Sequence, residues 1–167
     1  MIDYVTPDSI IGDHNVINFY GTGLLAKNSD ITIRFGNESC KVLTATHYAI
    51  LCSIGTVVAG SHEISVRINP KGYAMMDVDA AKAVVSLALV SDISPTEGSE
   101  YGGTEVTISG NGFDPVSGQT TVLIGGNICV ISKVTNSKIT CVTSAHKTGS
   151  FEVDLTSGGK NSSPVSD

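Results

Sequence analysis

The chain has 167 residues, of which 16 are acidic and 10 basic, so its net charge at neutral pH is −6. The basic residues are scattered singly, which excludes a nucleic-acid-binding surface, because such surfaces gather Lys and Arg against phosphates. The same pattern disfavours binding to anionic lipid headgroups. The most apolar stretch, residues 80–90, is far shorter than the ~20 residues that span a bilayer. We expect no nucleic-acid partner and no direct membrane insertion of these residues.

Residues 1–91 predict a series of short strands. Val, Ile and Thr alternate with polar residues there, and this period of two is typical of strands with one buried face. In chain order the expected strands are Tyr4–Pro7, Val16–Tyr20, Ile31–Phe35, Cys40–Leu43, Ala49–Cys52, Ser61–Ile68 and Val84–Val90. Gly36-Asn37 predicts a hairpin turn. Residues 75–83 have the propensity for a helical turn.

Residues 92–167 repeat the same plan. The expected strands are Ile93–Gly98, Glu105–Ser109, Thr121–Ile124, Ile128–Ser132, Lys138–Val142 and Gly149–Leu155. Phe113 is the expected large core residue, and Phe151 is expected to point inward. After Gly159 the sequence suggests that a closing strand is missing or truncated. Met1 directly precedes a predicted strand, with no secretory signal, so we interpret the chain as an excised fragment with an added start.

An internal repeat defines the domains. Gly21-Thr22-Gly23 returns as Gly110-Asn111-Gly112, 89 positions later, and the cysteines return at the same spacing. A glycine pair of this kind allows a bend or bulge that side chains would obstruct. We therefore predict two domains, residues 1–91 and 92–167, joined by a short junction.

The four cysteines indicate the compartment. They allow three pairings, and only Cys40 with Cys52 and Cys129 with Cys141 gives each half the same bond. Four reduced core thiols are the alternative. A zinc site is a weaker alternative, because no CxxC spacing occurs. We expect two stabilising disulfides and an oxidising compartment.

Two glycosylation motifs agree with that compartment. Asn37 begins N-E-S and Asn161 begins N-S-S, so both match the acceptor pattern. The pattern is short and arises often by chance. Together with the disulfides, it predicts the extracellular side of the plasma membrane, with Asn37 and Asn161 as glycan anchors.

The motifs of the second half occur in a fixed order that resembles the IPT/TIG family. They are I-S-P-T-E-G at 93–98, G-G-T at 102–104, V-T-I-S-G-N-G-F at 106–113, V-L-I-G-G-N-I-C at 122–129, I-T-C at 139–141 and G-S-F-E-V at 149–153. The first half matches more loosely, and it departs where G-G-T is expected, carrying His14-Asn15-Val16. The resemblance implies an all-β fold of two tandem immunoglobulin-like sandwiches.

Two further motifs, G-N-E-S-C-K-V at 36–42 and A-G-S-H at 59–62, are similar to the repeats of the fibrocystin family, its fibrocystin-like branch in particular. That resemblance implies modules from the ectodomain of a very large single-pass surface protein. It implies a structural or adhesive role in a cell-surface coat, such as that of hair-cell stereocilia in hearing. The implied partners are neighbouring IPT domains of the parent protein and a homophilic or other cell-surface protein.

No catalytic set emerges from the sequence. The four histidines, His14, His47, His62 and His146, lie in separate segments without a repeated nucleophile partner. We interpret them as surface or loop residues, and we expect neither enzymatic activity nor a cofactor.

The alternative function is a ligand-binding module that acts through the junction between the domains. Asp77, Asp79 and Asp92 could supply oxygen ligands to calcium, although their spacing matches no EF-hand loop and a solvated acidic face explains them better. For a carbohydrate site the chain lacks Trp, and Tyr73 and Tyr101 are better explained as packing residues.

Overall fold

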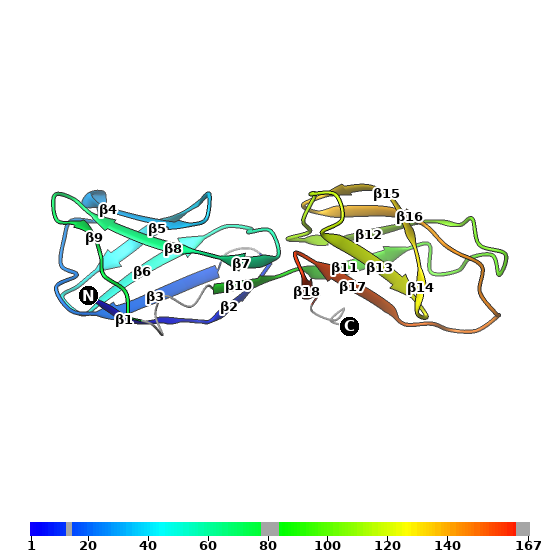
Figure 1. The fold of residues 1–167 in the computed structure, drawn as a ribbon, viewed down its shortest axis with the longest axis horizontal. Coiled ribbons are helices and arrows are strands. Elements are labelled where there is room, and N and C mark those ends of the chain that lie inside the picture. The colour runs from blue at the N-terminus through cyan, green and yellow to red at the C-terminus, as the bar shows by residue number, and fades with distance from the viewer. Residues whose placement is uncertain (13–14, 78–83, 163–167) are drawn as a thin grey trace. The chain divides into compact units, whose positions relative to one another are not determined.

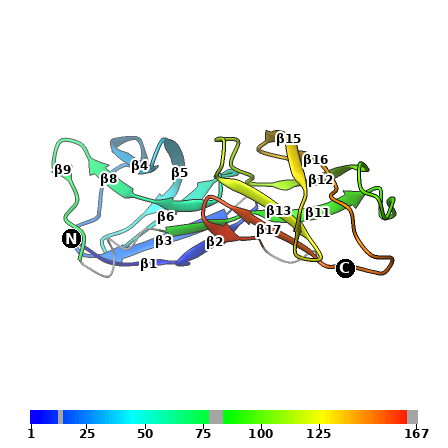
Figure 2. The ribbon, with the colours of Figure 1, turned by 45° about the vertical axis from the view of Figure 1, so that its right-hand side comes forward.

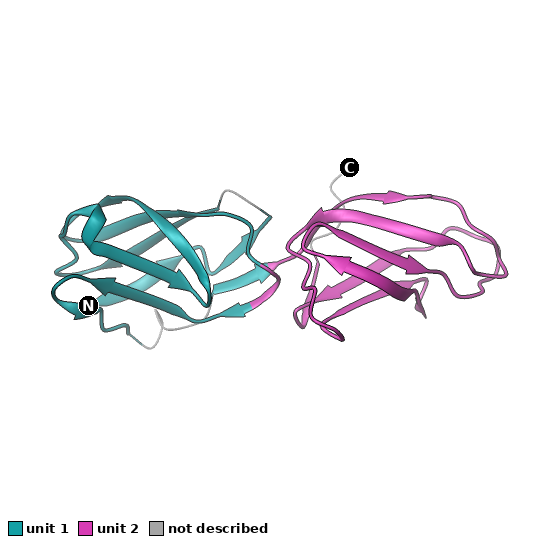
Figure 3. Cartoon of the chain, turned by 90° about the horizontal axis from the view of Figure 1, so that it is seen from above, with its two compact units in different colours: residues 1–57, 61–86 teal, residues 58–60, 87–167 magenta. Residues whose placement is uncertain are grey.

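The chain folds into two β-rich units. The computed structural model describes residues 1–12, 15–77 and 84–162, which hold β-strands and one short 3-10 helix. Unit 1 comprises residues 1–57 and 61–86, and unit 2 comprises residues 58–60 and 87–167 (Figure 3). The predicted all-β class is confirmed. The division after Ser86 precedes the expected one after residue 91, because Leu89–Ser94 pairs with Glu105–Asn111 in unit 2.

Residues 1–87 form two hydrogen-bonded sheets. The elements are β1 (Ile2–Thr6), β2 (Ser9–Ile11), β3 (Asn15–Gly21), η1 (Asn28–Asp30), β4 (Ile31–Phe35), β5 (Glu38–Ala45), β6 (Ala49–Ile54), β7 (Gly60–His62), β8 (Ile64–Ile68), β9 (Gly72–Tyr73) and β10 (Val84–Leu87) (Figure 1). The larger sheet has the order β1-β3-β6-β5-β4-β8-β9, and the smaller one has the order β2-β10-β7.

Strand β5 joins the two parts of the larger sheet. Its first residues pair with β4, where Cys40 lies opposite Ile33. Its later residues pair with β6, where Lys41 lies opposite Ser53. The strand therefore changes partner directly after Cys40. This change lets β4 and β8 turn back over β3 and β6 to form a sandwich.

One hydrophobic core fills that sandwich. Ile17 and Phe19 of β3 and Ile33 and Phe35 of β4 are all buried, as the alternation in these strands predicts. The rings of Phe19 and Phe35 lie 6.2 Å apart, which places residues from both parts of the sheet in contact.

Unit 2 repeats this sandwich with separate sheets. Its strands are β11 (Leu89–Ser94), β12 (Glu105–Asn111), β13 (Thr120–Ile124), β14 (Asn127–Ile128), β15 (Val130–Thr135), β16 (Lys138–Val142), β17 (Val153–Ser157) and β18 (Lys160–Asn161). The sheet orders are β11-β12-β16-β15 and β14-β13-β17-β18. Strands β13 and β17 lie side by side in the second sheet (Figure 2). Phe113 is fully buried, so its predicted role as a core residue is confirmed.

The repeated glycine pair has a structural cause. A methyl group on Gly110 would overlap the carbonyl oxygen of Leu89, and one on Gly21 would overlap that of Met1. In both units the first strand therefore approaches the next one too closely for a side chain. The second glycine of the pair, Gly112, has a φ of +79°, which favours glycine.

Several sequence expectations are wrong in detail. The expected strand Ser61–Ile68 is divided at Glu63, and the expected strand Ile128–Ser132 is divided at Cys129. Val84–Val90 is not one strand, because β10 ends at Leu87 and β11 begins at Leu89 with new partners in unit 2. Phe151 is 41% exposed instead of inward, because β17 begins only at Val153. The sequence also predicts a helical turn within residues 75–83. Of these, residues 78–83 lie outside the described part of the chain.

Replacing Gly110 tests the close approach of β11 and β12. We expect Gly110→Ala to lower the free energy of unfolding of unit 2 by about 3 kcal/mol, because backbone atoms must move to admit the methyl group. The matched control is Gly118→Ala, where φ is +81° and the space around a methyl group is open. That change should cost about 1 kcal/mol. Urea unfolding of both variants measures the difference, and equal losses would contradict the steric argument.

Candidate functional site

Two disulfides occupy equivalent positions in the two units. Cys40 is bonded to Cys52, with a Cα–Cα distance of 5.7 Å, and Cys129 to Cys141, with a Cα–Cα distance of 5.5 Å. These bonds contain all four cysteines of the chain, so the alternatives of reduced thiols and a zinc site do not apply. All four side chains are buried.

Each disulfide lies where a strand changes from one sheet to the other. In unit 2 the residue between β14 and β15 is Cys129, whose backbone N–H donates to Val122 of β13. Its sulfur is bonded to Cys141 of β16, a strand of the opposite sheet. In unit 1 Cys40 is the last residue of β5 that pairs with β4, and its partner lies on β6. Both bonds therefore connect the two layers of a sandwich.

The glycosylation candidates have different surroundings. Asn37 lies in the β4–β5 hairpin turn, and all three residues of its motif are exposed. Asn161 lies in β18, where its side-chain oxygen accepts a hydrogen bond from the Thr156 hydroxyl at 3.2 Å. The third residue of that motif, Ser163, lies outside the described residues. Both asparagines are exposed, and only Asn161 has its side-chain oxygen in a hydrogen bond.

The calcium candidates do not form a site in the described structure. Asp77 belongs to unit 1 and Asp92 to unit 2, and both are exposed. Asp79 lies outside the described residues. Across residues 1–12, 15–77 and 84–162, no three His, Cys, Asp or Glu side chains gather in a way that could hold a metal ion.

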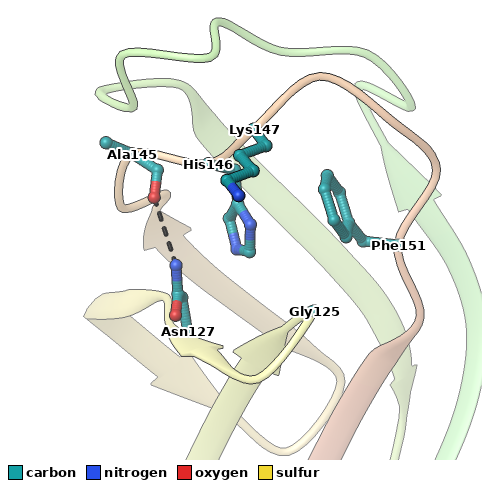
Figure 4. A pocket seen from close by; sticks show the side chains of 6 residues that line it. All are labelled: Gly125, Asn127, Ala145, His146, Lys147 and Phe151. Atoms are coloured by element: carbon teal, nitrogen blue, oxygen red, sulfur yellow. Dashed lines mark hydrogen bonds between the residues drawn. The ribbon is translucent and has the colours of Figure 1, made fainter.

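A shallow concavity of about 420 Å³ lies on unit 2 and was not foreseen from the sequence. Figure 4 shows its lining residues, with His146 and Phe151 pointing toward the same space. The residues that line the concavity are Gly125, Asn127, Ala145, His146, Lys147 and Phe151. The rings of His146 and Phe151 lie 4.4 Å apart. Asn127 donates its amide N–H to the carbonyl of Ala145 at 3.1 Å.

The two rings cover the hairpin between β13 and β14. The His146 Nε2 is hydrogen-bonded to the Ile124 carbonyl, and a methyl group on Gly125 would lie 2.6 Å from the Phe151 ring. In unit 1, Gly36 is equivalent to Gly125 and His62 is equivalent to Phe151. The His62 ring faces Gly36 there, as the Phe151 ring faces Gly125. This correspondence is the signal that could have revealed the concavity from the repeat.

The tyrosines lie at the surface of the units. Tyr73 and Tyr101 are 73% and 85% exposed, so neither packs in the core of its unit. Tyr4 and Tyr20, which pair across β1 and β3, stack with ring centroids 4.6 Å apart. Tyr4 is half exposed, and the pair therefore forms an aromatic patch on the outer face of the sheet.

The histidines also lie apart. His47 is exposed, and His62 and His146 are half-buried, while His14 lies outside the described residues.

Among the helical residues that the structure describes, none form a segment long and apolar enough to cross a membrane.

A family model of the IPT/TIG domain matches residues 2–79 and again residues 88–166. The chain belongs to the IPT/TIG family. The two matched regions correspond to the two sandwiches, and the immunoglobulin-like fold expected from the sequence motifs is confirmed.

Curated relatives of this IPT/TIG pair are fibrocystins. Human fibrocystin-L is 34% identical over 151 residues, which cover 90% of this chain and 3% of that protein. Mouse fibrocystin is 25% identical over 119 residues, which cover 71% of this chain and 3% of that protein. The chain thus spans only a small part of the length of these relatives. The resemblance to fibrocystin-like proteins is confirmed.

One solved structure has a similar fold. The surface glycan-binding protein PbSGBP-B from Prevotella bryantii matches with a TM-score of 0.55 and 16% identity, over 97% of this chain and 41% of that one. At this identity the match supports the fold alone.

Proposed function

We propose that this IPT/TIG pair is a non-enzymatic structural and adhesive segment in the ectodomain of a large single-pass cell-surface protein. The observation that carries the proposal is the repeated disulfide at the strand crossover of each unit. Structural disulfides persist in oxidising compartments and are rare in the cytosol. The fibrocystin relatives support the same placement, on the extracellular side of the plasma membrane.

The disulfides suit a module that must stay folded outside the cell. A domain of roughly 80 residues buries only about 60–65% of the surface of its unfolded chain, so its core alone gives modest stability. A covalent link between the two layers adds to that stability without a larger core. In a long array each module then keeps its shape independently, which suits a surface coat, including one on stereocilia.

The outer face of the β1-β3-β6 sheet supports an adhesive role. Tyr4 lies opposite Tyr20, and the neighbouring row places Asn18 opposite Leu51. Val16, next along β3, is 45% exposed. We call these five residues the tyrosine face. Its five members are uncharged, and Lys41 of β5 borders it, because Lys41 lies opposite Ser53 and Ser53 lies opposite Val16. Exposed aromatic residues are typical of protein interfaces.

Sedimentation velocity tests the adhesive part of the proposal. We expect a concentration-dependent dimer, and we expect Tyr4→Lys to weaken it more than about tenfold, the effect of ~1.4 kcal/mol. The matched control is Tyr73→Lys, because Tyr73 is more exposed and lies on β9, outside the tyrosine face.

The outcomes separate the candidate roles. A monomer at every concentration would contradict homophilic adhesion and leave a spacer role. Equal effects of the two substitutions would contradict the choice of the tyrosine face. Dimerisation that requires calcium would instead support the carboxylates of Asp77 and Asp92 as ligands.

Glycosylation tests the proposed compartment. When the chain is secreted from mammalian cells, we expect enzymatic deglycosylation to lower its mass, and Asn37→Gln to remove most of that change. Asn161→Gln is the comparison, because the Asn161 side chain is already engaged with Thr156. No mass change in the unsubstituted protein would mean that neither acceptor is used.

A further inference from the structure

A second pocket of unit 2 lies between a loop and the outermost strand of a sheet. It has a volume of about 340 Å³. Residues 115–118 and Thr120 line one wall, and residues 131–134 of β15 line the other. Strand β15 is the last strand of its sheet, and it contains a β-bulge at Ser132. We call this space the bulge pocket.

The internal repeat shows which chemical group fills this place in unit 1. There Leu43 is the bulge residue of β5, and the side-chain N–H of Asn28 donates to its carbonyl at 2.9 Å. At the repeat spacing of 89 residues, Asn28 corresponds to Ser117 and Leu43 to Ser132. A carboxamide thus bridges the loop and the bulge in unit 1, and the counterparts of both bonded residues line the bulge pocket in unit 2.

Backbone hydrogen bonds support this correspondence. The N–H of Asp30 donates to the carbonyl of Lys27 at 2.8 Å, and at the equivalent place the N–H of Gln119 donates to that of Val116 at 3.1 Å. The two loops therefore make the same turn beside the same kind of bulge. The equivalence places the bulge carbonyl of unit 2 toward the loop, across the pocket.

Ser117 is too short to take the place of Asn28. Its hydroxyl oxygen lies one bond nearer to the backbone than an asparagine amide nitrogen does, and no hydrogen bond joins it to Ser132 among the described residues. The Ser132 hydroxyl donates to the carbonyl of Thr140 instead, at 3.1 Å. The bulge carbonyl is therefore available to an N–H donor from outside the chain.

The other lining groups suit a ligand larger than one carboxamide. The pocket volume lies within the range of small-ligand sites, and a single side-chain amide would fill only a small part of it. Ser117 offers a hydroxyl and Lys133 an ammonium donor, while Val116, 61% exposed, offers an apolar surface. Polar groups on both walls beside an apolar surface match a sugar ring that carries an acetamido group.

We propose that the bulge pocket of unit 2 binds an N-acetylhexosamine unit of a glycan. The acetamido N–H donates to the Ser132 carbonyl, as the carboxamide does in unit 1, and the acetyl methyl group packs on Val116. Ring hydroxyls bond to Lys133 and to the Ser117 hydroxyl. Because recognition rests on the amide, the site does not depend on Trp, which the chain lacks. This activity goes beyond the structural and adhesive role and is independent of the tyrosine face.

An NMR titration of the full chain tests the proposal. The probe is methyl N-acetyl-β-D-glucosaminide, and we expect saturable amide shifts at residues 117–118 and 132–133 with a Kd on the order of 1 mM. Amides of Asn28 and Leu43 should not shift, because the unit 1 carboxamide already fills that place. Methyl β-D-glucoside carries a hydroxyl in place of the acetamido group, so it should bind at least about tenfold more weakly.

Ser117→Asn is the matched variant, because it introduces the unit 1 side chain at the equivalent position of unit 2. We expect a protected side-chain amide signal, which reports the bond to the bulge carbonyl, and at least about a tenfold loss of affinity for the glucosaminide. Gln119→Asn is the control, since residue 119 is exposed and does not line the pocket. That variant should bind as the unsubstituted chain does.

Three results would overturn the proposal. They are the absence of saturable shifts up to roughly 50 mM, equal affinities for the two glycosides, and undiminished binding to Ser117→Asn when its side-chain amide is protected. Tighter binding of N-acetylglutamine amide than of the glucosaminide would also overturn it, because the pocket would then recognise a protein side chain and not a sugar.

Discussion

The structure depends on one covalent constraint, the disulfide at the point where a strand leaves one sheet and joins the other. At Cys129 the chain ends its pairing with β13 and begins its pairing with β16 within two residues. Such a transition interrupts the hydrogen-bond ladder and is a weak point of a small sandwich. The bond to Cys141 fixes it by joining both layers through the buried core. The arrangement in unit 1 is the same, although β5 there remains continuous.

This constraint connects the fold to the proposed role. Each unit has its own core and its own bond, and the core of unit 2 includes Ala59 from the segment between β6 and β7. Modules of that kind can be repeated many times along a surface protein, as the fibrocystin relatives lead us to propose for this chain. The tyrosine face of the β1-β3-β6 sheet is a surface of unit 1 that remains available for binding.

The sequence predicts those parts that rest on short-range pattern. Alternation predicts the buried Phe19 and Ile108, and the repeat predicts both disulfides, because these features follow from residue type and spacing. The exposure of Phe151 could not be predicted, since it depends on where β17 begins and on the hairpin that its ring covers. The stacking of Tyr4 on Tyr20 also escaped prediction, because it needs the register between β1 and β3, which composition does not encode.

The most direct test of this account removes the crossover bond from one unit at a time. Cys129→Ala with Cys141→Ala should lower the free energy of unfolding of unit 2 by about 3 kcal/mol in the loop-entropy model. Urea unfolding followed through the NMR signals of the buried Ile108 and Ile17 reports on each unit separately. We expect an early transition at Ile108 with that at Ile17 unchanged, and the reverse for Cys40→Ala with Cys52→Ala. A loss below ~1 kcal/mol would contradict it.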